Sequence, residues 1–287
     1  MHQSDNNFLA SLSVEYELIT PWTGQAFNQV PDAANQIHGD TLAKQYGFKG
    51  ALVPGVTISA YLVHPAMEAW GLAWLQRGAA QIRVISPLYD EESFDVVINE
   101  ASTNRYTAKL ERADGIVSAT AEVSLPDSEQ PSPSKRGDPI ADPDYRGPAA
   151  SVDRWSELQS VGCHAFRFQW PGESKMQTYL RDESQMPKLL QSTGGGYANL
   201  CFILGCSNWI LEHNAAMNPW VHLETQSQNY CPIAAGTSIV AEMRVAGFFA
   251  KKGHEFVDVE VNLFDERDDA CLTAIKLRAI YKLRGSK

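Results

Sequence analysis

The sequence lacks the features that mark secreted proteins and membrane proteins. Its five cysteines are an odd number without a C-x-x-C pair, so neither a disulfide framework nor a zinc ribbon is predicted. No apolar run is long enough to cross a membrane, and residues 1–10 contain no apolar segment of signal-peptide length. We expect a cytoplasmic protein with reduced thiols and no membrane partner.

Basic residues and cofactor motifs are also scarce. The 24 Lys and Arg residues are outnumbered by 34 Asp and Glu residues, which gives a formal net charge of -10. Nucleic-acid binding depends on cations that neutralise phosphates, so we expect no nucleic-acid partner. The sequence has no G-x-S-x-G elbow, no H-E-x-x-H zinc helix and no Rossmann fingerprint. We therefore expect no bound metal and no resident cofactor.

A proline-rich segment divides the chain near its middle. Residues 126–153 carry six of the fifteen prolines, together with Ser, Asp, Gly and charged residues, which is typical of a linker. We predict an N-terminal unit over 1–127, a linker over 128–155 and a C-terminal unit over 156–287.

The two units resemble one another at a constant offset. Pro87 and Ser93 match Pro232 and Ser238, each 145 residues further along. Apolar stretches over 56–69 and 201–214 share the same offset. Both stretches are apolar on nearly every side, which predicts two buried helices.

Strands are predicted after each helix. Residues 257–263 and 275–283 alternate apolar and polar side chains, and the segments 103–111 and 116–125 flank the turn pair Asp114-Gly115. The pattern predicts an α+β fold, in which each half is an antiparallel sheet wrapped around one long buried helix. Pairing the halves edge to edge would give one continuous sheet without an exposed central edge, a tandem or double hotdog.

A polar constellation lies between the first strand and the first helix. It resembles the MaoC-like, type 2 (R-specific) enoyl-CoA hydratase family, whose signature D-x-N-P-[IV]-H-x-D is followed by Ala, Gly-Phe and an H-G pair at the helix start. The resemblance covers roughly residues 35–56. The matching positions are Asn35, Ile37, His38, Asp40, Ala43, Gly47, Phe48 and Gly55.

Three positions depart from the signature. Gln36 replaces its Pro, Pro54 replaces the His before Gly55, and Ala33 stands where the family has its catalytic Asp. Asp32 lies one residue early. The acid of the family's dyad is therefore present only if a shift in this loop brings Asp32 inward.

The resemblance implies a set of roles. Hydrating a 2-enoyl thioester needs a base for water, a proton for C2 and donors for the enolate oxygen. His38 would be the general base, Asn35 would position water or the dyad, Asp32 would be the acid partner and Asp40 a reserve acid. Gly55 would be the oxyanion donor at the helix start.

The alternative is that His38 and Asn35 are ordinary loop and capping residues. Further substrate-binding residues are expected at Asp40, Phe48, Val53, Pro54 and Val56.

The second half does not repeat the motif. At the same offset His38 falls on Glu183 and Asn35 on Leu180, so we expect one active site. The glycines of 194–196 precede the second helix without a P-loop Lys, which favours close backbone packing over phosphate binding. The segment Lys251-Lys252-Gly253-His254 is interpreted as a solvated hairpin tip.

Three functions remain open. The leading hypothesis is a hydro-lyase of fatty acid metabolism, an enoyl thioester hydratase or 3-hydroxyacyl thioester dehydratase acting on acyl-CoA or acyl-carrier-protein. The second is an acyl-CoA thioesterase that uses Glu183 or Asp182. The third, suggested by Ala33, is a catalytically silent acyl-binding protein. A monomer of fused halves and a homodimer are both compatible with this arrangement.

Overall fold

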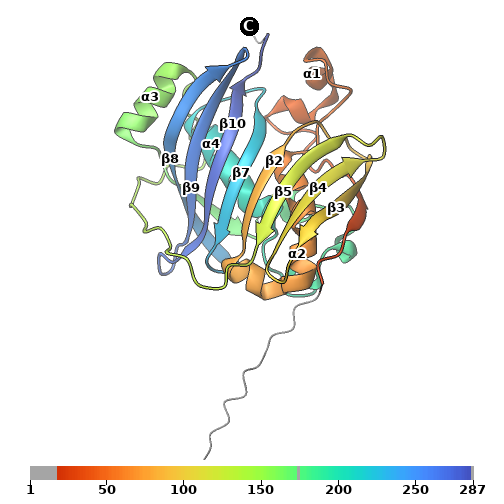
Figure 1. Cartoon of the computed structure of the whole chain (residues 1–287). Helices are drawn as coiled ribbons and strands as arrows, with labels where there is room; N and C mark the ends of the chain where they lie inside the picture. Colours follow the sequence, from red (N-terminus) through yellow and green to blue (C-terminus); the bar gives the residue numbers. More distant parts are fainter. Residues whose placement is uncertain (1–17, 173–174, 286–287) are drawn as a thin grey trace, which may run out of the picture.

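The computed structural model describes residues 18–172 and 175–285, and its main feature is one antiparallel sheet of ten strands (Figure 1). The strands run in the order β1-β3-β4-β5-β2-β7-β10-β9-β8-β6 across the sheet. Their bounds are β1 Trp22–Gln25, β2 Ala79–Val84, β3 Ser93–Ala101, β4 Arg105–Arg112, β5 Val117–Ser124, β6 Phe166–Trp170, β7 Val221–Asn229, β8 Thr237–Lys251, β9 His254–Asp265 and β10 Cys271–Lys282.

Two long helices lie against one face of this sheet. They are α2 (Gly55–Arg77) and α4 (Leu200–Asn214), which contact each other and are seen behind the strands in Figure 1. The shorter helices are α1 (Asp40–Gln45) and α3 (Val152–Val161). Among the described residues, four 3-10 turns complete the helical elements: η1 Gln36–His38, η2 Lys175–Gln177, η3 Glu183–Gln185 and η4 Lys188–Leu190. In the part of the chain that the structure describes, no helix combines the length and apolar character needed to cross a membrane.

The predicted pairing of the two halves is confirmed at the centre of the sheet. Strand β2 of the first half pairs with β7 of the second, with Ala79 opposite Gln228 and Arg83 opposite Glu224. The internal repeat also appears in the backbone hydrogen bonds. The amide of Val53 donates to Leu88 at 2.9 Å, and 145 residues further along the amide of Ala198 donates to Ile233 at 2.9 Å.

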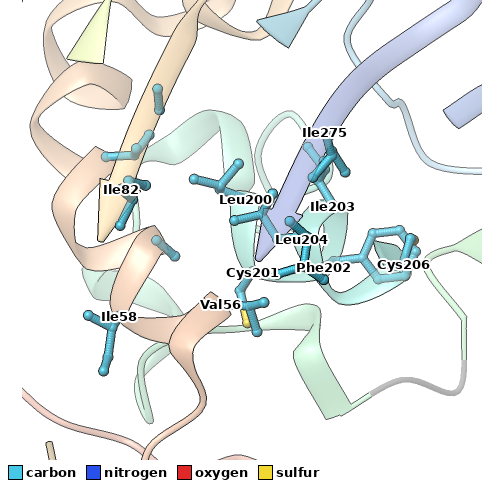
Figure 2. Close-up of a cluster of buried hydrophobic side chains, with 14 of the residues drawn as sticks. Val56, Ile58, Ile82, Leu200, Cys201, Phe202, Ile203, Leu204, Cys206 and Ile275 are labelled. Atoms are coloured by element: carbon cyan, nitrogen blue, oxygen red, sulfur yellow. The ribbon is translucent and has the colours of Figure 1, made fainter. Parts of the chain in front are cut away.

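The core lies where the two helices meet between the halves of the sheet. Figure 2 shows Cys201 of α4 next to Val56 of α2, with the apolar residues of both helices around them. Both helices are apolar on all sides because the sheet covers one side and the other helix or a loop covers another. Burial raises the pKa of the Cys201 thiol to about 12, so this thiol stays protonated. All five cysteines are free, in agreement with the absence of a predicted disulfide framework.

The hairpin and strand predictions are confirmed, whereas the helix bounds differ. Strands β4 and β5 flank the Asp114-Gly115 turn, and β9 and β10 cover the two alternating segments. Helix α2 continues beyond the predicted end at residue 69 to Arg77, through a break at Gly71, where φ is 49°. A glycine adopts this conformation at low cost, so α2 consists of two helical segments joined by a kink at Gly71.

The segment between the halves is anchored rather than loose. The amides of Arg136, Gly137 and Asp138 donate to the buried carboxylate of Glu242 on β8 at 2.7, 2.7 and 3.0 Å. The C-terminal end of the predicted linker, residue 155, lies inside α3. That helix begins at the Ser151 cap and packs Trp155 into the core.

Candidate active site

His38 lies at the end of η1, in the loop that leads to α2. Its Nδ1 is 2.8 Å from the carbonyl oxygen of Leu52. A carbonyl only accepts, so this nitrogen carries the proton, and the Nε2 lone pair is left for a substrate or water proton. Burial lowers the pKa of His38, and the hydrogen bond to Leu52 opposes this effect in part. The imidazole is therefore neutral near neutral pH, which is the state that a general base needs.

Two cavities have His38 as a lining residue in common. The smaller, of about 230 Å³, has mainly apolar walls that include Phe48, Val53 and Leu88. The larger, of about 750 Å³, is more polar. Five residues line both cavities and form what we call the neck: Asn35, His38, Pro54, Asn208 and Trp220.

The N-terminus of α2 faces the smaller cavity. The capping residue Pro54 supplies no side-chain hydrogen bond, and its carbonyl accepts from the amides of Thr57 and Ile58. The first-turn amide of Gly55 has no intrahelical acceptor. Because Gly55 lines the smaller cavity, this amide remains as a donor there, at the positive end of the helix dipole. A side chain at position 55 would be crowded, because a Cβ there would lie 3.1 Å from the ring and carbonyl of His222.

Asn35 connects the motif loop to the second half. Its amide nitrogen donates to the carbonyl of Trp220 at 3.0 Å, and its amide oxygen accepts from the Trp220 backbone N–H at 3.2 Å. Both polar atoms of the side chain are thus used in a two-point clamp. The clamp fixes the wall that carries His38 against the loop before β7.

Glu212 is a site residue that sequence reasoning missed. It lies on α4 and lines the larger cavity together with His38. The indole N–H of Trp220 donates to its Oε1 at 2.5 Å. Burial raises the pKa of the Glu212 carboxyl, against smaller opposing effects from Trp220 and the charge of Arg146. The sequence signal is that Glu212 is the one Asp, Glu, Lys or Arg within the mainly apolar helix α4.

The other predicted acids lie elsewhere. Asp32 is exposed and is not among the residues that line either cavity. Asp40 accepts from the amide of Ala51 at 2.8 Å and lies 3.9 Å from Lys44, so it supports the loop at the surface.

The predicted substrate-binding residues divide into two groups. Phe48, Val53 and Pro54 line the smaller cavity, together with the predicted oxyanion donor Gly55. Val56 is buried in the core, and neither it nor Asp40 lines the two cavities.

The carboxylates suggested for a thioesterase are engaged locally. Glu183 accepts from the hydroxyl of Ser192 at 3.1 Å, and Asp182 caps η3 through the amide of Ser184. Neither lines the two cavities that share His38. Among residues 18–172 and 175–285, no group of three or more His, Cys, Asp or Glu side chains is arranged to hold a metal ion.

The remaining motifs have structural roles. A Cβ at Gly194 would lie 2.0 Å from the carbonyl oxygen of Lys188, so this glycine is required by close backbone packing, as predicted. Residues 251–254 form the predicted hairpin tip between β8 and β9, with Lys252 and Gly253 at positive φ.

Comparison with solved structures identifies the fold. The chain is similar to a protein of unknown function with a hotdog fold from Alicyclobacillus acidocaldarius, with a TM-score of 0.51, 12% identity and coverage of 92% of this chain and 93% of that chain. A conserved hypothetical protein from Mycobacterium tuberculosis with a double hotdog fold gives a TM-score of 0.50 at 12% identity, covering 92% of this chain and 96% of that one. A tesB protein from Mycobacterium avium subspecies paratuberculosis gives 0.50 at 10% identity, covering 94% and 96%.

Sequence comparisons add no family assignment. No family model matches the chain, and a search of curated proteins finds no match. At 10–12% identity the structural likeness shows the fold alone. The chain is therefore an α+β protein with a hotdog fold in a double arrangement.

Proposed function

We propose that the protein is a hydro-lyase that adds water to a 2-enoyl thioester or removes it from a 3-hydroxyacyl thioester. One observation carries the proposal: a neutral imidazole with its Nε2 lone pair available lies at the neck of two cavities, and the uncapped N-terminus of α2 lies beside it. A base and a fixed amide donor are two of the three groups that this reaction needs.

The chemistry assigns one task to each group. His38 takes a proton from water as the water oxygen bonds to C3. The π electrons of the C2–C3 double bond move toward the carbonyl, and the resulting enolate oxygen accepts a hydrogen bond from the amide of Gly55. The enolate then takes a proton at C2. Dehydration follows the same steps in reverse.

The two cavities suit the two parts of an acyl thioester. The smaller cavity has apolar walls and would hold the acyl chain. The larger cavity is more polar, and the exposed guanidinium of Arg146 lies on its wall, where it would favour the anionic carrier arm of coenzyme A or of a carrier protein. The thioester carbon would then lie at the neck, next to His38.

A test follows the enoyl-thioester absorbance on mixing with protein, over short, medium and long acyl chains. The wild type should remove the absorbance. Removing a general base costs on the order of 10²–10⁴-fold in rate, so His38→Ala should lose the activity by about that factor. Glu129→Gln, in the exposed part of the linker, is the control and should match the wild type. Circular dichroism should show that all three are folded.

Equal behaviour of wild type and His38→Ala across all chain lengths would contradict the proposal. The thioesterase alternative stays a prediction, and it requires release of free thiol. A thiol-trapping assay on the same samples separates the two reactions, because hydration leaves the thioester intact.

A further inference from the structure

The third group that the reaction needs is an acid that can protonate C2. Ala33 stands where the resembled family has its Asp, and it contributes only a methyl group to the wall of the larger cavity. Asp32 does not line that wall. The loop that carries His38 therefore does not place a carboxyl group in the cavity at this point.

A carboxyl group enters the same cavity from the other half of the chain. Glu212 lines the larger cavity with Ala33 and His38, but it comes from α4 rather than from the motif loop. It is hydrogen-bonded to the indole of Trp220, which is itself a neck residue.

Glu212 is also connected to the motif through hydrogen bonds. The Asn35 side chain holds both backbone polar atoms of Trp220, and the indole of Trp220 donates to Oε1 of Glu212 at 2.5 Å. The indole can only donate, so it holds one carboxyl oxygen and leaves the other to carry a proton. Asn35 therefore positions Glu212 as well as the loop of His38.

The surroundings of Glu212 favour a carboxyl group that stays protonated to a higher pH than an exposed one does. Burial raises the pKa of Glu212, whereas Trp220 and Arg146 act in the opposite direction with smaller effect. The other titratable groups on the cavity wall are His38 and His213, and burial lowers the pKa of each. Neutral histidines do not stabilise the carboxylate as charged ones would.

We propose that Glu212 is the acid that delivers the proton to C2. This inference rests on the proposed hydro-lyase function. In the hydration direction the Glu212 O–H bond breaks, a C2–H bond forms, and the enolate electron pair becomes that bond. Glu212 is left as carboxylate and His38 as imidazolium. Exchange with solvent returns a proton to Glu212 and removes one from His38, so the net reaction consumes one water.

The experiment compares wild type, His38→Ala, Glu212→Gln, Glu212→Asp and Ala33→Asp/Glu212→Gln in the hydration assay, with Glu129→Gln as control. Glu212→Gln keeps an oxygen for the indole of Trp220 but has no acidic proton. Its kcat should fall on the order of 10²–10⁴-fold with little change in KM. Glu212→Asp should keep part of the rate. The double variant should recover part of it, because its new carboxyl faces the same cavity.

The pH profile separates an acid from a structural residue. The wild-type hydration rate should fall as pH rises through the pKa of Glu212, and Glu212→Asp should keep this limb. Glu212→Gln should lack it. A variant that merely perturbs the structure would lower the rate but leave the profile unchanged.

Two outcomes would overturn the inference while the proposed function stands. The first is Glu212→Gln with the wild-type rate and profile beside an inactive His38→Ala. The second is Glu212→Gln with a reduced rate but an unchanged alkaline limb. Activity that appears in Ala33→Asp/Glu212→Gln and is absent from wild type would also overturn the inference, because it would show that the natural chain lacks its acid. Absence of hydration in every protein would refute the proposed function itself.

Discussion

The N-termini of α2 and α4 occupy corresponding places in the two halves but are built differently. Pro54 precedes α2 and offers no side-chain cap, whereas Asn199, 145 residues later, accepts from the amide of Phe202 at 3.2 Å. Asn199 also donates to the carbonyls of Met176 and Gln177 at 3.2 and 2.7 Å. The helix end in the first half is open to a cavity, and the one in the second half is satisfied by protein.

The loops before the two helices show the same contrast. Each contains a 3-10 turn, with His38 in the first and Glu183 at the corresponding position of the second. His38 faces the neck, whereas Glu183 binds Ser192 locally. The same loop-and-helix arrangement thus forms a candidate site in the first half, whereas in the second half its polar groups bind each other. The difference lies in a few polar residues at the helix entrances and not in the fold.

The largest expected effect comes from making the first helix end resemble the second. In Pro54→Asn the new side chain would accept from the amide of Thr57, as Asn199 accepts from Phe202 at α4. It would also place a polar group beside the amide of Gly55, where it competes with the enolate oxygen for that donor. Since loss of one oxyanion donor costs on the order of 10²–10³-fold in kcat, the hydration rate should fall by about that factor. Enoyl-thioester absorbance is the measurement.

Pro54→Ala separates loss of the ring from gain of a cap. It removes the ring without supplying an acceptor, so its rate should fall less than that of Pro54→Asn. Equal rates in the two variants would show that the amides of this helix end are not used in the reaction.

Removing the cap from the second helix should lower the stability of the fold and leave the reaction rate unchanged. Asn199→Ala removes a cap and two further buried hydrogen bonds, and we expect a loss of roughly 2–3 kcal/mol in the free energy of unfolding. Urea denaturation measures this directly. Hydration by the folded fraction should be unchanged, and a specific loss of rate would show that the second helix end contributes to the site.

A smaller effect is expected from the histidine that packs against the open helix end. Burial lowers the pKa of His222 from 6.5 to about 3, so the folded state resists its protonation. The unfolded chain binds the extra proton between these values, and stability should therefore fall as pH drops from about 6.5 toward 3. The slope is about 1.4 kcal/mol per pH unit for this group.

Unfolding measured against pH in wild type and His222→Gln tests this expectation. The variant should have a shallower acid dependence, although His64 still contributes because burial lowers its pKa to about 4. Identical slopes in the two proteins would mean that His222 does not bind more protons in the unfolded state.

Much of the fold could be predicted because its pattern is local. The alternation in 257–263 and 275–283 and the Asp114-Gly115 turn specify strands and a hairpin, and these appear as β9, β10 and the β4–β5 hairpin. The offset of 145 residues indicated two similar halves, and backbone hydrogen bonds follow the same offset. The second segment of α2 was missed because a kink at Gly71 separates it from the first.

The site was less predictable because it depends on contacts between distant residues. His38 and Gly55 could be found from a compact motif. The clamp from Asn35 to Trp220 joins residues 185 positions apart, and no local sequence pattern predicts it. Glu212 lies on a helix whose apolar residues indicate only burial. Its approach to the cavity wall depends on how α4 packs against the first half.

The anchored segment between the halves has a consequence for how such a molecule can specialise. In a dimer of identical single units, any substitution occurs twice, so a helix end opened in one subunit is opened in both. A covalent connection removes that symmetry. Position 54 can then stay uncapped while position 199 gains a stabilising asparagine. The stability gained at the N-terminus of α4 offsets the cost of the unpaired amide at the N-terminus of α2.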